Sequence, residues 1–144
     1  MRKMSTRGRS GWTALSGFTL IEMMITVVIL GIILSIAISS YLDLVRESRR
    51  TEAKALLQEV MNREERYYTT ENAYTDDLTD LGYVTPLESE SNWYQVTASY
   101  CTAGDDQCVE LTAAPQDDQT NDVCGSFTLD SSGERDKTGS GTCW

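Results

Sequence analysis

Residues 17–42 of the chain read GFTLIEMMITVVILGIILSIAISSYL, and this run decides how the N-terminal part folds. It contains a single charged residue, Glu22, close to its start. About 20 apolar residues are enough to cross the hydrocarbon of a bilayer as a helix. A charge inside that helix costs on the order of 3 kcal/mol, and the run holds no cation to offset it. The most economical source of a cation is a new α-amino group, created by cutting the chain directly after Gly17.

The run follows a short basic segment that is typical of a targeting leader. Residues 1–17 carry Arg2, Lys3, Arg7 and Arg9 and no acidic residue. Basic residues on this side hold the N-terminus in the cytoplasm. A conventional secretory signal, cut near residues 36–40, is the alternative. The apolar run is long for such a signal and continues without a break into a strongly helical segment, which favours a membrane anchor.

Charge and composition exclude several function classes. The chain has 12 basic and 22 acidic residues, and four of the basic ones precede Gly17, so the part beyond Gly17 carries a net charge of −14. A domain this acidic repels nucleic acid, and we expect no nucleic-acid partner. The chain has no histidine, which removes Ser-His and Cys-His nucleophilic catalysis. We therefore expect no enzyme activity, no catalytic residue and no cofactor.

Clustered aspartates are a candidate calcium site. They occur at residues 105–106, 117–118 and 122, and calcium prefers several such oxygen ligands. None of these clusters forms an ordered ligand loop of the type D-x-D-x-D-G. We interpret them as solvated charge and expect no metal site.

Beyond Leu42 the pattern predicts an amphipathic helix packed on a small sheet. Apolar side chains recur at steps of three and four residues and so share one helix face: Ala53, Leu56, Leu57, Val60, Tyr67 and Tyr68. A helix over residues 18–68 would be roughly 75 Å long. β-prone segments predict strands over residues 93–100, 109–112 and 125–129. The fold class is therefore α+β, a long N-terminal helix on an antiparallel sheet of three to four strands.

Four cysteines lie in this domain, at Cys101, Cys108, Cys124 and Cys143. An even number in a small domain beyond a membrane helix indicates disulfides in an oxidising compartment. Zinc is the alternative, but the chain contains no C-x-x-C pair and no histidine. Cys101 and Cys108 flank a turn, so a bridge that closes a hairpin is the local expectation.

The junction between the basic leader and the apolar helix reads Gly17-Phe18-Thr19-Leu20-Ile21-Glu22. This string resembles the N-terminus of type IV pilins and of the related secretion pseudopilins. Downstream stretches are similar to a subgroup of small minor-pilin and pilin-like proteins with a class III prepilin leader, which often end in Cys-Trp. They are residues 50–54, 65–68, 78–83 and 124–130, with Cys143-Trp144 at the end. The resemblance covers nearly all of the chain and implies the pilin fold.

The resemblance also implies how the chain is processed and assembled. A prepilin peptidase would cleave between Gly17 and Phe18 and methylate the new amino group of Phe18. Glu22 would then meet the Phe18 ammonium of a neighbouring subunit. The implied partners are the peptidase, other pilin subunits and the bacterial inner membrane, with the N-terminus cytoplasmic and the C-terminal domain periplasmic. The implied destination is an extracellular pilus of the kind that serves adhesion and twitching motility.

Three regions follow from the same resemblance. They are a prepilin leader (residues 1–17), a transmembrane and assembly helix (residues 18–42) and a globular pilin domain (residues 43–144). The stretch from Cys124 to Cys143 would match the disulfide-bounded loop at the pilin C-terminus. We therefore favour the bridges 101–108 with 124–143 over 101–124 with 108–143 and over 101–143 with 108–124.

One departure from the family pattern concerns the middle of the apolar helix. Family members commonly carry a proline about eight residues after the glycine found at Gly31, where this chain has Ser39-Ser40. Proline would kink the helix and favour local melting on assembly. The extent of melting is therefore open for this chain.

Three functions compete. The first is a major or minor subunit of a type IV pilus, and the second is a pseudopilin of a type II secretion system. The third is a membrane-anchored binding domain. The cysteines and the Cys-Trp end favour the pilus, and no ligand-pocket signature supports the third function.

Overall fold

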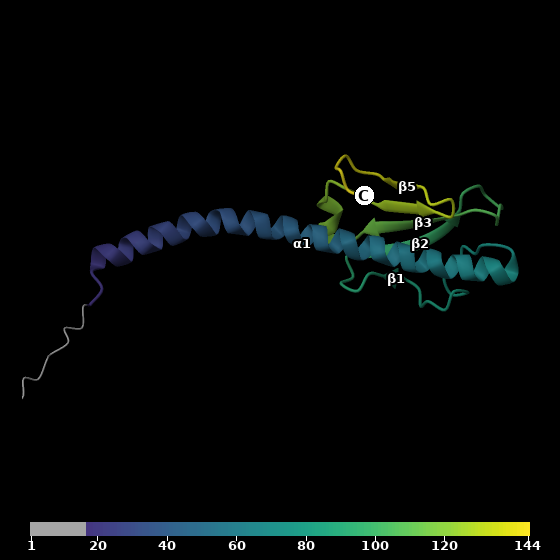
Figure 1. Ribbon diagram of the computed structural model, residues 1–144, viewed down its shortest axis with the longest axis horizontal. Coiled ribbons are helices and arrows are strands. Elements are labelled where there is room, and N and C mark those ends of the chain that lie inside the picture. The colour runs from purple at the N-terminus through teal and green to yellow at the C-terminus, as the bar shows by residue number, and fades with distance from the viewer. Residues whose placement is uncertain (1–16) are drawn as a thin grey trace, which may run out of the picture. The chain divides into compact units, whose positions relative to one another are not determined.

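A computed structural model describes residues 17–144, except for the side chain of Ser39. Residues 1–16 of the predicted leader lie outside the described residues. The described chain falls into two units, with the boundary between Ser39 and Ser40, and each unit is considered by itself. The elements, labelled in Figure 1, are α1 (Leu20–Glu71), β1 (Leu87–Glu88), β2 (Tyr94–Tyr100), β3 (Val109–Pro115), the 3-10 helix η1 (Asp117–Asn121), β4 (Phe127–Asp130) and β5 (Arg135–Lys137).

The first unit is the apolar part of α1. Its most apolar 18-residue window has a mean hydropathy of 2.7 and is not buried by the rest of the described chain. By length and composition the helix could cross a membrane. The hydroxyls of Thr26 and Ser35 donate to the carbonyls of Met23 and Ile32, at 2.9 and 2.7 Å. These polar groups are satisfied within the helix, as a hydrocarbon environment requires.

In the second unit the C-terminal half of α1 lies along one face of the sheet (Figure 1). The predicted apolar stripe forms the contact, since Ala53, Leu57 and Val60 are fully buried in the hydrophobic core. The sheet contributes its helix-facing side chains to the same core: Tyr94, Val96, Val109, Leu111, Ala113, Phe127 and Leu129. Their alternation along the strands follows the two-residue period of a half-buried sheet.

The sheet has five antiparallel strands in the order β1-β2-β3-β4-β5, so the predicted count of three to four is wrong. The three predicted strands are present as β2, β3 and β4. The two additional strands are the edges, of two and three residues. Both edge strands are too short to carry a periodic signal, and they form because a neighbouring strand offers its hydrogen-bonding groups.

One carboxyl group is enclosed between α1 and the loop that follows it. Glu64 is fully buried, and its Oε2 accepts the backbone N–H of Thr75 at 3.3 Å. Within residues 17–144, its Oε1 has no hydrogen-bond partner. Burial raises the pKa of Glu64 to about 7, the bond from Thr75 opposes this rise, and the charges of Glu65, Asp76 and Asp80 add to it.

We expect this carboxyl to make stability depend on pH. Its pKa rises from the ordinary 4.5 to about 7 on folding, so the folded state holds the proton that the unfolded chain has already released. The free energy of unfolding should therefore decrease between about pH 4.5 and pH 7, by on the order of 3 kcal/mol, and stay low above that interval. Glu64→Gln, which is neutral at every pH, should remove this decrease.

Thermal unfolding of the detergent-solubilised full chain across that pH range measures the effect. Glu90→Gln, at an exposed position, is the matched control and should keep the wild-type profile. Parallel profiles for the wild type and Glu64→Gln would contradict the role assigned to Glu64.

Candidate functional site

The start of α1 places the predicted cleavage site outside the helix. Gly17, Phe18 and Thr19 are exposed and non-helical. The Thr19 hydroxyl accepts the backbone N–H of Glu22 at 3.3 Å, and the Thr19 carbonyl accepts that of Met23 at 3.2 Å. Thr19 is thus the N-cap of the helix, with a glutamate three residues later as in a capping box. The cap fixes the helix start at Leu20 and leaves the bond between Gly17 and Phe18 free of helical hydrogen bonds.

Glu22 is the one charged side chain in the described helix before Asp43. It is exposed, and so are the apolar side chains around it. The first basic residue along the helix is Arg46, 24 residues further on, which is about 36 Å at 1.5 Å per residue. No basic side chain of the described helix is therefore close enough in sequence to pair with Glu22.

The helix is continuous where family members commonly carry a proline. α1 runs without interruption through Gly31 and Ser40, where a proline is absent. A methyl group added at Gly31 would meet nothing within 4 Å. In the single chain Gly31 is therefore neither a break nor a site of close packing.

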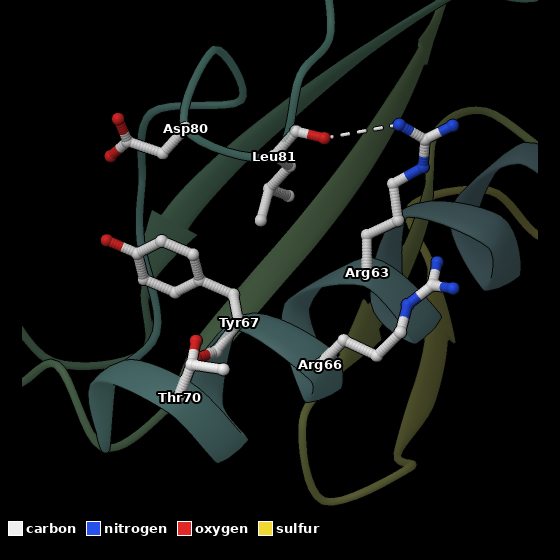
Figure 2. Close-up of a pocket in the computed structure, with 6 residues that line it drawn as sticks. All are labelled: Arg63, Arg66, Tyr67, Thr70, Asp80 and Leu81. Carbon is white, nitrogen blue, oxygen red and sulfur yellow. Dashed lines mark hydrogen bonds between the residues drawn. The ribbon is translucent and has the colours of Figure 1, made fainter.

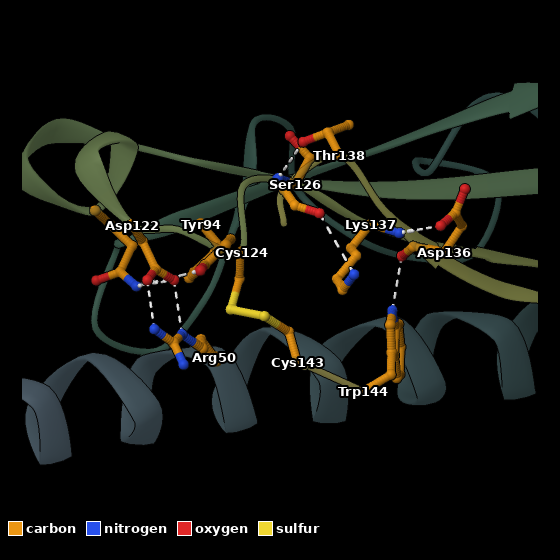
Figure 3. The surroundings of a disulfide bond; sticks show 12 residues. Arg50, Tyr94, Asp122, Cys124, Ser126, Asp136, Lys137, Thr138, Cys143 and Trp144 are labelled. Carbon is orange, nitrogen blue, oxygen red and sulfur yellow. Dashed lines mark hydrogen bonds and ion pairs between the residues drawn. A yellow bond between two sulfur atoms is a disulfide. The ribbon is translucent and has the colours of Figure 1, made fainter. Parts of the chain in front are cut away.

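The structure joins Cys101 to Cys108 and Cys124 to Cys143, with Cα–Cα distances of 5.4 and 5.9 Å. This is the pairing that the sequence analysis favoured. Cys124 and Cys143 belong to the hydrophobic core, and their bridge lies between the sheet and α1 (Figure 3). Gly139 packs directly on the backbone of this region, because an added Cβ would collide with the Val123 carbonyl oxygen. The C-terminal loop is therefore held tightly against the sheet.

The C-terminal Trp144 is packed rather than free. Its Nε1 donates to the Asp136 carbonyl at 2.7 Å, and its ring meets that of Phe127 edge-on, with centroids 5.6 Å apart. Lys54 and Arg135 place cationic groups 5.6 and 5.4 Å from the centre of the indole. Burial lowers the pKa of Lys54, with a further contribution from the nearby Arg50. The Cys-Trp end thus closes the domain against α1.

A buried polar network ties α1 to η1, and sequence reasoning missed it. The Arg50 guanidinium donates through two nitrogens to the two carboxylate oxygens of Asp122, whose side chain is 1% exposed. This side-chain hydrogen bond raises the pKa of Arg50. Gln119 donates to the Tyr94 hydroxyl at 3.2 Å and accepts from Arg49 at 3.4 Å. Arg50 and Asp122 are 72 residues apart in the sequence, so no local pattern connects them.

Comparison with known families agrees with this geometry. Residues 39–128 match the family described as "Type IV minor pilin ComP, DNA uptake sequence receptor". Residues 15–38 match the prokaryotic N-terminal methylation motif. The first match covers more than half of the chain, and the second covers the leader junction and most of the apolar helix.

Individual relatives are pilins as well. The type IV major pilin protein PilA of Myxococcus xanthus (strain DK1622) is 34% identical over 89 residues, which are 62% of this chain and 39% of PilA. This chain therefore spans well under two thirds of the length of that relative.

Two solved structures share the fold. A type IV pilin from Shewanella oneidensis has a TM-score of 0.52 at 24% identity, covering 69% of this chain and 97% of that one. The Neisseria meningitidis non-core minor pilin PilV has a TM-score of 0.53 at 22% identity, covering 69% and 93%. The helix-on-sheet fold is thus that of type IV pilins, and the resemblance drawn from the leader junction is confirmed. Because the family match covers residues 39–128 and the methylation motif covers residues 15–38, the chain belongs to the type IV minor pilin family.

Proposed function

We propose that this pilin is cut after Gly17, methylated at Phe18, stored in the bacterial inner membrane and then polymerised into a pilus through its N-terminal helix. One observation carries the proposal: Glu22 is the lone charge on an exposed apolar helix, and no basic side chain lies within 23 residues after it. A prepilin peptidase would supply the missing cation by creating an amino group at Phe18. The leader would keep the N-terminus cytoplasmic, and residues 43–144 would be periplasmic.

The pair between Glu22 and a neighbour's Phe18 would set the register between subunits. An isolated carboxylate among apolar helices is costly, and a hydrogen-bonded ammonium offsets most of that cost. Phe18 and Glu22 are four residues apart, so the pair favours neighbours shifted by about 6 Å along the helix axis. Subunits at another shift would leave both charges unpaired, so the pair contributes more to specificity than to net stability.

The description of the matching family names a DNA uptake sequence receptor. For this chain we propose no nucleic-acid partner. The part beyond Gly17 carries a net charge of −14, which opposes binding to phosphates. Its few cations are also partly engaged, since Arg50 pairs with Asp122 and Arg63 with Glu59. A structural role, without enzyme activity, agrees with the family.

We favour a pilus over a secretion pseudopilus, because two disulfides brace the domain for an exposed filament. Sheared surface filaments that contain this chain would distinguish the two. Its amount there relative to other pilins would separate a major from a minor subunit.

Mass spectrometry of the exported chain tests the processing step. We expect a polypeptide that begins at Phe18 with one added methyl group on its α-amino nitrogen. The same chain from cells without prepilin peptidase should retain residues 1–17. A mature chain with residues 1–17 intact, or one that begins near Ser40, would contradict the proposal and support a plain anchor or a secretory signal.

Substitution of Glu22 tests the assembly step. Glu22→Ala should insert into the membrane at the wild-type level, because it removes a charge from an apolar helix. It should enter filaments at least about a hundredfold less, since breaking a buried ion pair costs about 3–5 kcal/mol. Thr26→Ala is the matched control, because the Thr26 hydroxyl bonds to the helix's own Met23 carbonyl. Filaments of Glu22→Ala in the wild-type amount would show that the pair is dispensable.

A further inference from the structure

A groove of about 530 Å³ lies between the C-terminal part of α1 and the loop that follows it (Figure 2). Its lining residues are Arg63, Arg66, Tyr67, Thr70, Asp80 and Leu81. Arg63 is engaged within the chain, since it donates to the Leu81 carbonyl at 3.1 Å and pairs with Glu59 at 3.2 Å. Arg66 is exposed, and no carboxylate of residues 17–144 lies within 4.0 Å of its guanidinium. The groove therefore presents a cation that the described chain does not neutralise.

A complementary feature lies on η1. Asp117 and Asp118 are exposed, and among the described residues neither carboxylate takes part in a hydrogen bond or an ion pair. The next residue, Gln119, is fully buried and bonds to Tyr94 and Arg49. η1 thus presents two adjacent carboxylates on a support fixed in the core, and a contact made by such a preorganised group loses little entropy.

The two features cannot meet within one copy. The bonds from Arg49 to Gln119 and from Arg50 to Asp122 hold η1 beside the middle of α1. Arg66 lies 16 residues beyond Arg50, which is about 24 Å further along the helix and about 160° around it. The cationic groove and the acidic pair are therefore on opposite sides of α1 and at different heights. Opposite placement of this kind suits a head-to-tail contact between copies, which propagates into an open array.

The net charge of the chain favours such a contact. Copies with a net charge of −14 beyond Gly17 repel each other when they pack side by side. An exposed cation without a partner in its own chain can relieve that repulsion where it meets a neighbour's carboxylates.

We propose that the Arg66 groove binds the Asp117–Asp118 segment of a second copy, a different neighbour from the one that pairs with Glu22, shifted by about 24 Å along the helix axis. This contact rests on the proposed function, since it operates in the polymer. The contact places the second copy's η1 against the side of α1 that carries Arg66, next to Tyr67 and Thr70. Glu22 then sets the register of the apolar helices, and Arg66 sets the lateral packing of the globular domains.

Charge reversal in the full-length chain tests the contact, with the amount of the chain in sheared filaments as the readout. Arg66→Glu should reduce filament incorporation at least about tenfold, because like charges then face each other across the interface. Asp117→Arg combined with Asp118→Arg should have a similar effect. The triple variant that exchanges the charges should restore incorporation. Glu90→Arg, at an exposed position outside both features, is the matched control and should assemble normally.

Two further measurements distinguish a folding defect from an assembly defect. Thermal unfolding of the detergent-extracted single variants should match the wild type, because Arg66, Asp117 and Asp118 are exposed. In filaments, Arg66→Cys and Asp118→Cys in one chain should yield disulfide-linked oligomers under mild oxidation, and neither single variant should.

Filaments of Arg66→Glu in the wild-type amount, or a failure of the exchange to restore assembly, would overturn the contact while the Glu22 test stands. Absence of the wild-type chain from sheared filaments would overturn the proposed function as well.

Discussion

A backbone that enters hydrocarbon must bond its own N–H and C=O groups, and the N-terminal part of the structure depends on this constraint. α1 satisfies it over the apolar run, and the hydroxyls of Thr26 and Ser35 turn to carbonyls of the same helix. The Thr19 cap then leaves Gly17 and Phe18 outside the helix. Among the described side chains of the apolar run, Glu22 is the one that carries a charge. Under the proposed function, a second molecule supplies the opposite charge.

The globular unit is held together by different means. Its apolar core is modest, and a buried ion pair and two disulfides reinforce it. In the chain-entropy model, the loop closed by Cys124 and Cys143 contributes about 3 kcal/mol. The pair between Arg50 and Asp122 fixes η1 to α1, and breaking one partner of such a pair is costly because the other is left buried and charged. The same network that stabilises the fold thus holds Asp117 and Asp118 in place at the surface.

Periodic signals in the sequence predicted the long helix and three strands, and the turn between Cys101 and Cys108 predicted their bridge. The bridge between Cys124 and Cys143 was instead implied by the resemblance to pilins. β1 and β5 could not be predicted this way, since strands of two and three residues exist only through pairing with β2 and β4. The contact between Arg50 and Asp122 joins distant segments, and the burial of Glu64 depends on a loop that returns over the helix at Thr75. The groove at Arg66 has the same origin, because residues 80–81 form one of its walls. The roles of Gly17, Phe18 and Glu22 are read from the leader junction and stay predictions.

The most direct measurement is the structure of the assembled filament by cryo-electron microscopy, at a resolution that shows side chains near the filament axis. The decisive quantity is the distance from the Glu22 carboxylate to the amino nitrogen of Phe18 in the adjoining subunit. We expect a separation within about 4 Å, the range of an ion pair, in every interior subunit. A carboxylate that faces only apolar side chains, or that is neutralised by some other cation, would contradict the central role assigned to Glu22.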